Sequence, residues 1–140
     1  MKEVERAAHA LVRRTVRAER RGFTVSALRE HGPVDFTFAR KSSVLRVQLK
    51  SSSAPSRVGF VSWARTFWEY APSADVLLFV LFDLRNKLAP NFYLFDLRKK
   101  TAPKCLRGKS AIRTTVKNFK SDFHNYKVTR TISSALLELL

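Results

Sequence analysis

The sequence has little cysteine, no long hydrophobic run and no internal repeat, and each absence excludes a class of protein. Its one cysteine, Cys105, cannot form an intrachain disulfide, and the 3 histidines offer no zinc-ligand spacing. The most hydrophobic run, Val76 to Phe82, is too short to cross a bilayer, and the charged N-terminus lacks a signal-peptide core. The lack of repeats argues against a solenoid. We therefore expect a soluble protein in a reducing, intracellular setting, such as the cytoplasm of a prokaryotic, archaeal or virus-infected cell.

Acidic residues are also scarce. The chain has 11 Asp plus Glu against 27 Lys plus Arg, which gives a formal net charge of +16. Such a charge predicts a polyanionic partner, and nucleic acid fits best because each neutralised phosphate releases counterions. The alternatives are a basic surface without such a partner and a membrane-surface helix over Lys2 to Arg21. The apolar residues of that helix are small and lack aromatic anchors, which argues against a membrane.

The composition is sufficient for a folded core. Of the 140 residues, 45% are hydrophobic and 11 are Phe. This length is typical of one domain, so we expect a single domain over residues 1–140. Within it, residues 98–130 form a basic segment in which many Lys and Arg residues are opposed only by Asp122. We expect that segment to bind nucleic acid.

Periodicity divides the first part of the chain into a helix followed by strands. Apolar residues recur at helical spacing from Lys2 to about Arg20, and Gly22 supplies a C-terminal stop. Alternating patterns then predict three strands, and the short polar turn between the last two predicts a hairpin. The expected strands are Phe23 to Leu28, Val34 to Ala39 and Val44 to Lys50, with Arg40 to Ser43 as the turn.

The second part of the chain contains the remaining strands. A flexible Ser-rich loop is expected from Ser51 to Ser56, and the stretch Arg57 to Tyr70 fits a strand, a turn or a short helix about equally. Asp75 to Asp83 and Asn91 to Leu97 are expected strands, the first of them buried on both faces. Together these elements predict an α/β fold with a mixed sheet of about five strands flanked by helices.

Three polar residues of the expected hairpin converge. Alternate side chains of a strand share a face, so Gln48 and Lys50 point the same way, and Asp35 on the neighbouring strand meets them. Phosphodiester hydrolysis needs a divalent cation and positive charge near the phosphate. Asp35, Gln48 and the backbone carbonyl of Leu49 supply oxygen ligands for Mg²⁺ or Mn²⁺. Lys50 would position or activate the attacking water and stabilise the phosphorus centre.

This arrangement resembles the PD-(D/E)xK nuclease superfamily, which includes restriction enzymes and Holliday junction resolvases. The shared features are a leading helix with an early acidic residue, an Asp-bearing strand, a tight turn, a strand ending in Gln-x-Lys and a Ser-rich stretch. The run Arg-Val-Gln-Leu-Lys-Ser-Ser is similar to a branch in which Gln replaces the usual Glu, known in a group of homing endonucleases. The resemblance implies a restriction-endonuclease-like fold.

The same resemblance implies an activity and assigns roles. It implies Mg²⁺-dependent endonucleolytic cleavage of DNA, including branched DNA. It places Asp35 and Gln48 at the metal and makes Lys50 catalytic. In many members a Glu on the first helix also faces the site, and Glu5 matches that position best, because Glu19 lies too near the helix end.

Alternatives to these roles stay open. The chain reads Pro33-Val34-Asp35 where the family usually shows Pro-Asp. Gln48 removes one negative charge from the site, so the fold could bind DNA without cutting it. In a purely structural alternative, Asp35 is a surface residue near a turn, and Gln48 and Lys50 lie on the solvated face of an edge strand. A further alternative is a basic RNA- or ribosome-associated protein with an accidental Gln-x-Lys.

The basic segment contains Lys and Arg at helical spacing, which predicts a helix with a basic stripe on one face. The stripe is Lys109, Arg113, Lys117 and Lys120, with Ile112, Val116 and Phe119 turned to the core. We expect it to follow a phosphate backbone without reading bases. The other expected nucleic-acid contacts are Ser51, Ser52, Lys104 and Arg107.

A homodimer or higher homo-oligomer is expected, because a chain of this size carries one active site and cutting both strands of a duplex usually takes two. The expected interface elements are the Trp-rich stretch, Trp63 to Tyr70, and an apolar C-terminal helix. Packing accounts for the aromatic stretch better than base stacking does. The C-terminal helix is expected to be capped by Ser133 or Ser134 and to present Leu136, Leu137, Leu139 and Leu140.

Overall fold

The structure is a computed structural model that describes residues 3–19, 22–27, 35–53, 60–63, 74–82, 90–99 and 112–140. Within these ranges, residues 3–5, 27, 52–53, 60–63, 112–114 and 116 are described by their backbone alone. Most of the Trp-rich stretch therefore lies outside the described residues, as do Lys104, Arg107 and Lys109. In the part of the chain that is described, no helix is both long enough and apolar enough to cross a membrane.

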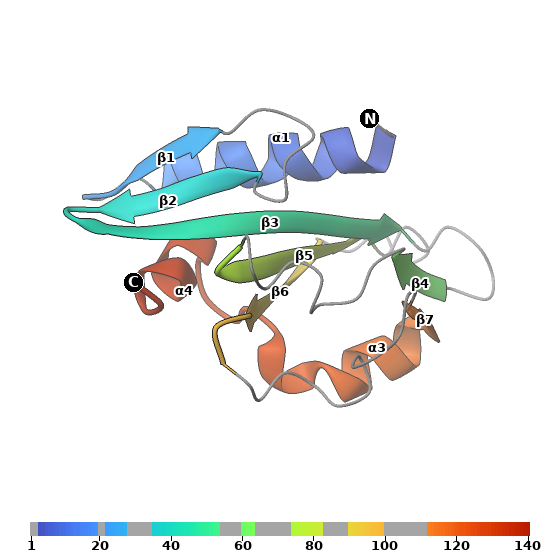
Figure 1. Cartoon of the computed structure of the whole chain (residues 1–140). Helices are drawn as coiled ribbons and strands as arrows, with labels where there is room; N and C mark the ends of the chain where they lie inside the picture. Colours follow the sequence, from blue (N-terminus) through green and yellow to red (C-terminus); the bar gives the residue numbers. More distant parts are fainter. Residues whose placement is uncertain are drawn as a thin grey trace.

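A five-stranded mixed sheet forms the centre of the protein (Figure 1). Its strand order is β1-β2-β3-β5-β6, in which β3 and β5 pair in parallel and the other neighbours pair antiparallel. The strands are β1 (Thr24–Ala27), β2 (Phe36–Arg40), β3 (Ser43–Ser53), β5 (Val76–Phe82) and β6 (Asn91–Asp96). The sheet confirms the expected α/β architecture and the expected number of central strands.

Helices α1 (Glu3–Ala18) and α4 (Ile132–Leu137) cover one face of this sheet. Helical spacing brings Ala8, Val12 and Val16 of α1 to one side, where all three are buried. Ile132 and Leu136 of α4 join the same core. Their partners from the sheet are Phe36, Phe38, Leu45, Val47, Leu49, Val76, Leu78 and Val80. The predicted first helix is confirmed, and Gly22 follows it with φ of 71°, a conformation that favours glycine.

The C-terminal helix is a core element, which corrects its expected role as an interface element. Leu136 is fully buried, and Leu137, Leu139 and Leu140 pack against the same core. The cap is also different from the expected one, because the hydroxyl of Thr131 accepts the hydrogen bond from the backbone N–H of Ser134 at 3.1 Å. The apolar face was visible in the sequence, but only the structure shows that α1 and the sheet occupy it.

The opposite face of the sheet carries aromatic side chains. Helix α3 (Val116–Asp122) and the 3-10 turn η2 (His124–Tyr126) lie against it. Phe119 of α3 packs against Phe79 with tilted rings and meets Tyr93 edge-on, with ring centroids 5.1 Å and 4.9 Å apart. Phe95 of β6 and Phe123 extend the contact. Much of the phenylalanine content is therefore used in a second core layer.

A second, two-stranded sheet pairs β4 (Phe60–Trp63) with β7 (Ile112–Thr115). β7 corrects the expected helix over residues 109–120, because Ile112 to Thr115 are extended and α3 starts only at Val116, behind the capping hydroxyl of Thr115. Arg113 is therefore on a strand, away from the helical row that Lys117 and Lys120 share. Strand pairing with β4, a partner distant in sequence, overrides the local helical spacing.

Strand β3 is longer than expected. Ser51, Ser52 and Ser53 continue it and pair with Val80, Leu81 and Phe82 of β5, so they are not part of a flexible loop. The β2–β3 hairpin itself is confirmed, with Arg40 opposite Ser43. In its turn Lys41 has φ of 54°, in the left-handed region that non-glycine residues adopt at a cost.

We expect Lys41→Gly to stabilise the protein. Glycine adopts a positive φ without the clash between Cβ and the following carbonyl, which costs other residues about 1–2 kcal/mol. Because glycine also gains freedom in the unfolded chain, the net gain in free energy of unfolding should be about 0.5–1 kcal/mol in urea titrations. Ser42→Gly is the matched control, since Ser42 is not among the residues with positive φ. A loss of stability in Lys41→Gly equal to that in Ser42→Gly would contradict the strain.

Candidate functional site

Asp35 lies directly before β2, whose first residue, Phe36, pairs with Val47 of β3. Its backbone N–H donates to the carbonyl oxygen of Val47 at 2.8 Å. Its carboxylate Oδ2 accepts a hydrogen bond from the backbone N–H of Leu49 at 2.7 Å. The side chain is 19% exposed. The carboxylate is therefore held against β3 and is still reachable from solvent.

Gln48 is buried in the middle of the sheet, 6% exposed, and pairs with Leu77 of β5. This position contradicts the edge-strand alternative, because β3 has neighbours on both sides. Its Oε1 is buried and has no hydrogen-bond partner among the described residues. A buried acceptor without a partner costs about 1–3 kcal/mol, so a bound partner would stabilise this position. The sequence predicted the face on which Gln48 lies but not its burial.

Leu49 and Lys50 flank the site from the same strand. The Leu49 side chain packs in the core under α1, so alternation places Gln48 and Lys50 on the other face. Lys50 is half-buried and lies opposite Phe79. The N–H and C=O of one strand residue leave on the same side of the strand, so the Leu49 carbonyl leaves β3 on the side of Asp35. A carboxylate, an amide oxygen and a carbonyl are thus presented by two adjacent strands.

His9 of α1 is a site residue that the sequence analysis missed. Its Nε2 lies 3.4 Å from the Asp35 Oδ1, and its side chain is 24% exposed. The signal was present, because His9 follows Glu5 by four residues and so lies on the same side of the helix. The side chain of Glu5 lies outside the description, but its backbone is one turn from the residue that meets Asp35. Glu19 serves another purpose, since its carboxylate accepts a hydrogen bond from the backbone N–H of Ser133 at 2.9 Å.

The expected nucleic-acid contacts are dispersed. Ser51 is half-buried in β3, and only the backbone of Ser52 is described. Lys117 is exposed and Lys120 half-buried on α3, while Arg113 is on β7. The structure therefore does not bring the expected stripe together on one helix.

The residues around Asp35 fit a hard cation only sparingly. Among the described residues, no three His, Cys, Asp or Glu side chains gather closely enough to hold a metal ion. The unpartnered Oε1 of Gln48 is nevertheless an oxygen of the type that Mg²⁺ prefers, and Mg²⁺ keeps several waters of its own. One carboxylate, one amide oxygen and one carbonyl satisfy such an ion when waters complete its shell. The chemical types of these oxygen donors therefore suit Mg²⁺.

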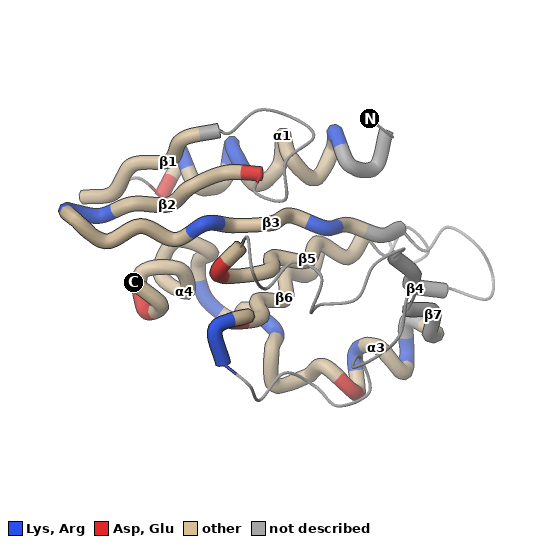
Figure 2. Tube along the Cα trace, viewed as in Figure 1, with Lys and Arg blue, Asp and Glu red and all other residues tan. Residues whose placement is uncertain are grey.

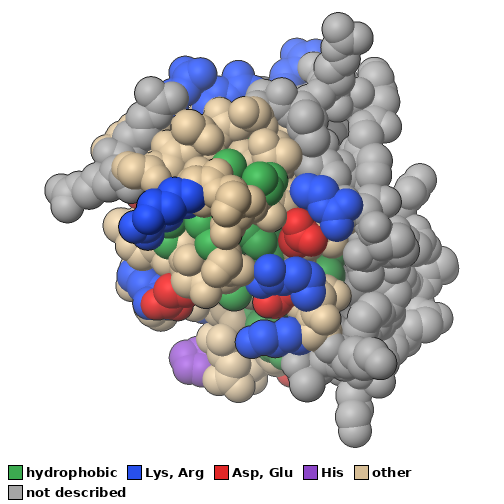
Figure 3. Space-filling model, turned by 60° about the vertical axis from the view of Figure 1, so that its left-hand side comes forward, with side chains coloured by type: hydrophobic (Ala, Val, Ile, Leu, Met, Phe, Trp, Pro, Cys, Tyr) green, Lys and Arg blue, Asp and Glu red, His purple; other side chains and the backbone are tan. Residues whose placement is uncertain are grey.

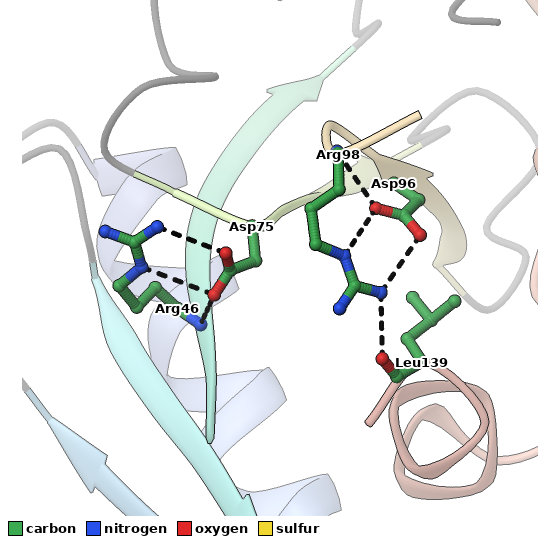
Figure 4. A network of polar contacts seen from close by, with 5 residues as sticks. All are labelled: Arg46, Asp75, Asp96, Arg98 and Leu139. Carbon is green, nitrogen blue, oxygen red and sulfur yellow. Dashed lines mark hydrogen bonds and ion pairs between the residues drawn. The ribbon is translucent and has the colours of Figure 1, made fainter. Parts of the chain in front are cut away.

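Asp75, named in the sequence only as a strand-end residue, holds β5 to β3 through charge (Figure 4). Its carboxylate accepts hydrogen bonds from the Arg46 backbone N–H at 2.8 Å and from the Arg46 Nη2 at 3.1 Å. Asp96, the last residue of β6, pairs with Arg98. The Nη2 of Arg98 also donates to the carbonyl oxygen of Leu139. These contacts fix the strands that carry the site.

Both carboxyl groups of this network have lowered pKa values. Burial alone would raise the pKa of Asp75, but hydrogen bonds from Arg46 and the charges of Arg46 and Arg98 lower it below its ordinary value. Burial likewise opposes the shift at Asp96, where hydrogen bonds from Arg98 and the charges of Arg98 and Lys99 lower the pKa. The folded state therefore prefers both groups ionised.

Two solved structures share the arrangement of these strands and helices. The bacterial homing endonuclease I-Ssp6803I matches with a TM-score of 0.52 and 18% identity, over 98% of this chain and 88% of that chain. Hjc, a Holliday junction resolvase of the archaeal hyperthermophile Archaeoglobus fulgidus, matches with a TM-score of 0.50 and 12% identity, over 96% and 95%.

The chain shares its fold with these two proteins. No protein-family model and no curated protein matches the sequence. The fold implied by Asp35, Gln48 and Lys50 is thus confirmed by structures that share less than a fifth of the residues. At that identity the likeness concerns the fold, and the chemistry rests on the residues of this nuclease-like chain.

The lowered pKa values predict acid sensitivity. A group with a lowered folded-state pKa adds stability above its unfolded pKa and loses it as pH falls through the folded value. We therefore expect the free energy of unfolding to fall below about pH 4. Asp75→Asn should lower stability at pH 7 by about 1–2 kcal/mol and flatten this decline.

The matched control for this prediction is Asp122→Asn, which removes one charge from an exposed position on α3. In urea titrations between pH 2.5 and pH 7, the free energy of unfolding of this control should fall with pH as steeply as that of the parent. An Asp75→Asn variant that declines as steeply as the parent would show that the Asp75 pKa is not lowered by folding.

Proposed function

We propose that the protein is an Mg²⁺-dependent endodeoxyribonuclease that hydrolyses phosphodiester bonds, including those of branched DNA. The observations that carry the proposal are the buried, unpartnered Oε1 of Gln48 and the Asp35 carboxylate held by the N–H of the next residue, Leu49, on a nuclease-like fold. The two structural neighbours are a homing endonuclease and a Holliday junction resolvase, which supports DNA as the substrate. The formal charge of +16 supports the same partner.

Each residue of the site has a role in this proposal. Asp35, Gln48 and the Leu49 carbonyl would hold Mg²⁺ or Mn²⁺, and the Leu49 N–H keeps the carboxylate turned to β3. When bound, such an ion polarises the phosphate and activates water. Lys50 brings a positive charge to the face of β3 that Gln48 also occupies, where it would stabilise the charge that develops on the phosphate. Glu5 would add a carboxylate from α1.

The remaining features of the proposal concern assembly and DNA contact. Cutting both strands of a duplex calls for two sites, so we propose a homodimer of single-domain chains. Lys117 and Lys120 on α3 would contact phosphates together with Ser51, Ser52, Lys104, Arg107, Lys109 and Arg113.

A second candidate function is DNA binding without cleavage. The observation that favours it is the single carboxylate among the described ligands, since Gln48 brings no charge to neutralise a divalent cation. RNA binding by the same basic surface is the remaining alternative.

Lys50→Ala tests the proposed catalytic role. On supercoiled plasmid or four-way junction DNA with Mg²⁺, we expect cleavage to fall by about a hundredfold or more, because one charge on the developing oxyanion is lost. Binding to the same DNA in EDTA should stay largely intact. Lys41→Gly is the control, since it removes a lysine at the end of β2 far from Asp35.

The outcomes separate the alternatives. Cutting by Lys50→Ala at the parent's rate would make the assignment of the site wrong. Binding of DNA by the parent with no cleavage in Mg²⁺ or Mn²⁺ would favour the non-catalytic protein. The RNA-binding alternative would be favoured if the protein prefers RNA and if substitutions at Asp35 and Lys50 do not reduce that preference.

Gln48→Glu tests the metal site without an activity assay. A carboxylate buried at position 48 is unfavourable without a cation, so Tm in EDTA should fall below that of the parent. With 10 mM Mg²⁺, roughly a saturating concentration for such a site, the rise in Tm should be larger than in the parent, because the added charge strengthens binding. Asp35→Asn should abolish the rise. Equal Mg²⁺-induced shifts in all three proteins would rule out this site.

A further inference from the structure

A row of basic side chains runs along α1 on the side next to Asp35. The row consists of Arg6, His9, Arg13 and Arg17, which follow one another at spacings of three, four and four residues. Such spacings keep side chains on one face of a helix. The three arginines are exposed and His9 is half-buried, while the apolar residues of α1 face the sheet. We call these four residues the α1 row. Figure 2 marks the Lys and Arg positions along the backbone of α1 in blue.

The α1 row leads into the candidate site. His9 lies at its inner edge, with its Nε2 3.4 Å from the Asp35 Oδ1. A cavity of about 90 Å³ opens between α1 and the sheet, and His9, Arg13 and Arg17 line it together with Asp35 and Leu49. Three basic side chains and the two groups proposed to hold the cation therefore border one hollow.

The positive charge of the three arginines in the row is not neutralised by the rest of the described chain. No described carboxylate forms an ion pair with Arg6, Arg13 or Arg17. On the face shown in Figure 3, by contrast, basic side chains lie beside acidic ones around a hydrophobic area. A row of arginines without described acidic partners is costly for a fold that has no anion to place there.

We infer that the α1 row binds the phosphates of one DNA strand and guides that strand to Asp35. The inference rests on the proposed function, because it takes DNA as the partner. Eleven residues of helix separate Arg6 from Arg17, a rise of about 16 Å, which spans roughly five nucleotides at about 3.4 Å each. Guanidinium groups suit this partner, since their planar fork binds phosphate oxygens in pairs.

The structure also weighs against the other polyanion that a basic helix can meet, a membrane surface. A helix that lies in a bilayer interface buries its apolar face among lipids. In α1 that face is already occupied, because Ala8, Val12 and Val16 are buried against the sheet. Only the charged side of α1 is available to a partner, and phosphates in solution need no apolar face.

The test compares two double variants that remove the same charge. Arg13→Ala with Arg17→Ala removes two members of the α1 row. Arg14→Ala with Arg40→Ala removes two exposed arginines elsewhere, one on another side of α1 and one at the far end of β2. Both pairs are exposed, so both variants should keep the parent's circular dichroism spectrum and Tm.

Affinity is measured by fluorescence anisotropy with a labelled 30-base-pair duplex and with a four-way junction, in EDTA so that nothing is cut. At roughly 0.1 M salt, the affinity of the row variant for DNA should be lower than that of the parent by a factor of about ten or more. The magnitude of the slope of log K against log salt should fall by about 1.8, because two phosphate contacts are lost. In the control variant, the loss of DNA affinity and the change in slope should each be less than a third of those in the row variant. Equal losses in the two variants would overturn the inference.

Three further outcomes are decisive. If the parent binds no DNA, the proposed function and the inference fail together. If the parent binds and cuts DNA but the row variant binds as the parent does, only the inference fails. Sedimentation with vesicles of phosphatidylserine and phosphatidylcholine provides the last comparison, and loss of vesicle binding in the row variant with unchanged DNA binding would overturn the inference in favour of a membrane surface.

Discussion

The parallel pairing of β3 with β5 is the constraint on which the rest of the structure depends. A hairpin has its register set by its turn, but two parallel strands have no such turn and could slip by a residue, which would exchange the two faces of the strand. The Arg46 and Asp75 contacts fix this register, because both the backbone and the side chain of Arg46 bind one carboxylate. With the register fixed, Gln48 faces away from α1 and Leu49 faces toward it. The faces of β3 on which Gln48, Leu49 and Lys50 lie follow from this register.

Local signals made the first half of the fold predictable. The β2–β3 hairpin follows from two alternating runs and a short polar turn, and α1 follows from apolar residues at helical spacing ended by Gly22. The errors come from partners distant in sequence. Ser51 to Ser53 have the composition of a loop, yet pairing with β5 makes them strand. Residues Ile112 to Thr115 have helical spacing, yet pairing with β4 extends them. Composition and spacing describe a segment, whereas its neighbours decide its conformation.

Some features of the candidate site were likewise predictable from local sequence, and others were not. Alternation along one strand was enough to place Gln48 and Lys50 on a common face, and the hairpin was enough to bring Asp35 against β3, where it contacts Val47 and Leu49. Burial of Gln48 was not predictable, because it depends on what covers that face. His9 was missed for a related reason: its spacing from Glu5 was visible, but its approach to Asp35 depends on how α1 packs across the sheet.

Helix α1 also links two parts of the protein mechanically. Near its start His9 meets Asp35, and just beyond its end Glu19 holds the first turn of α4 through Ser133. Ten residues of helix separate these contacts, about 15 Å of a stiff rod packed on one core. One helix therefore contacts both the Asp35 carboxylate and the start of α4, so a restraint on either contact also restrains the other.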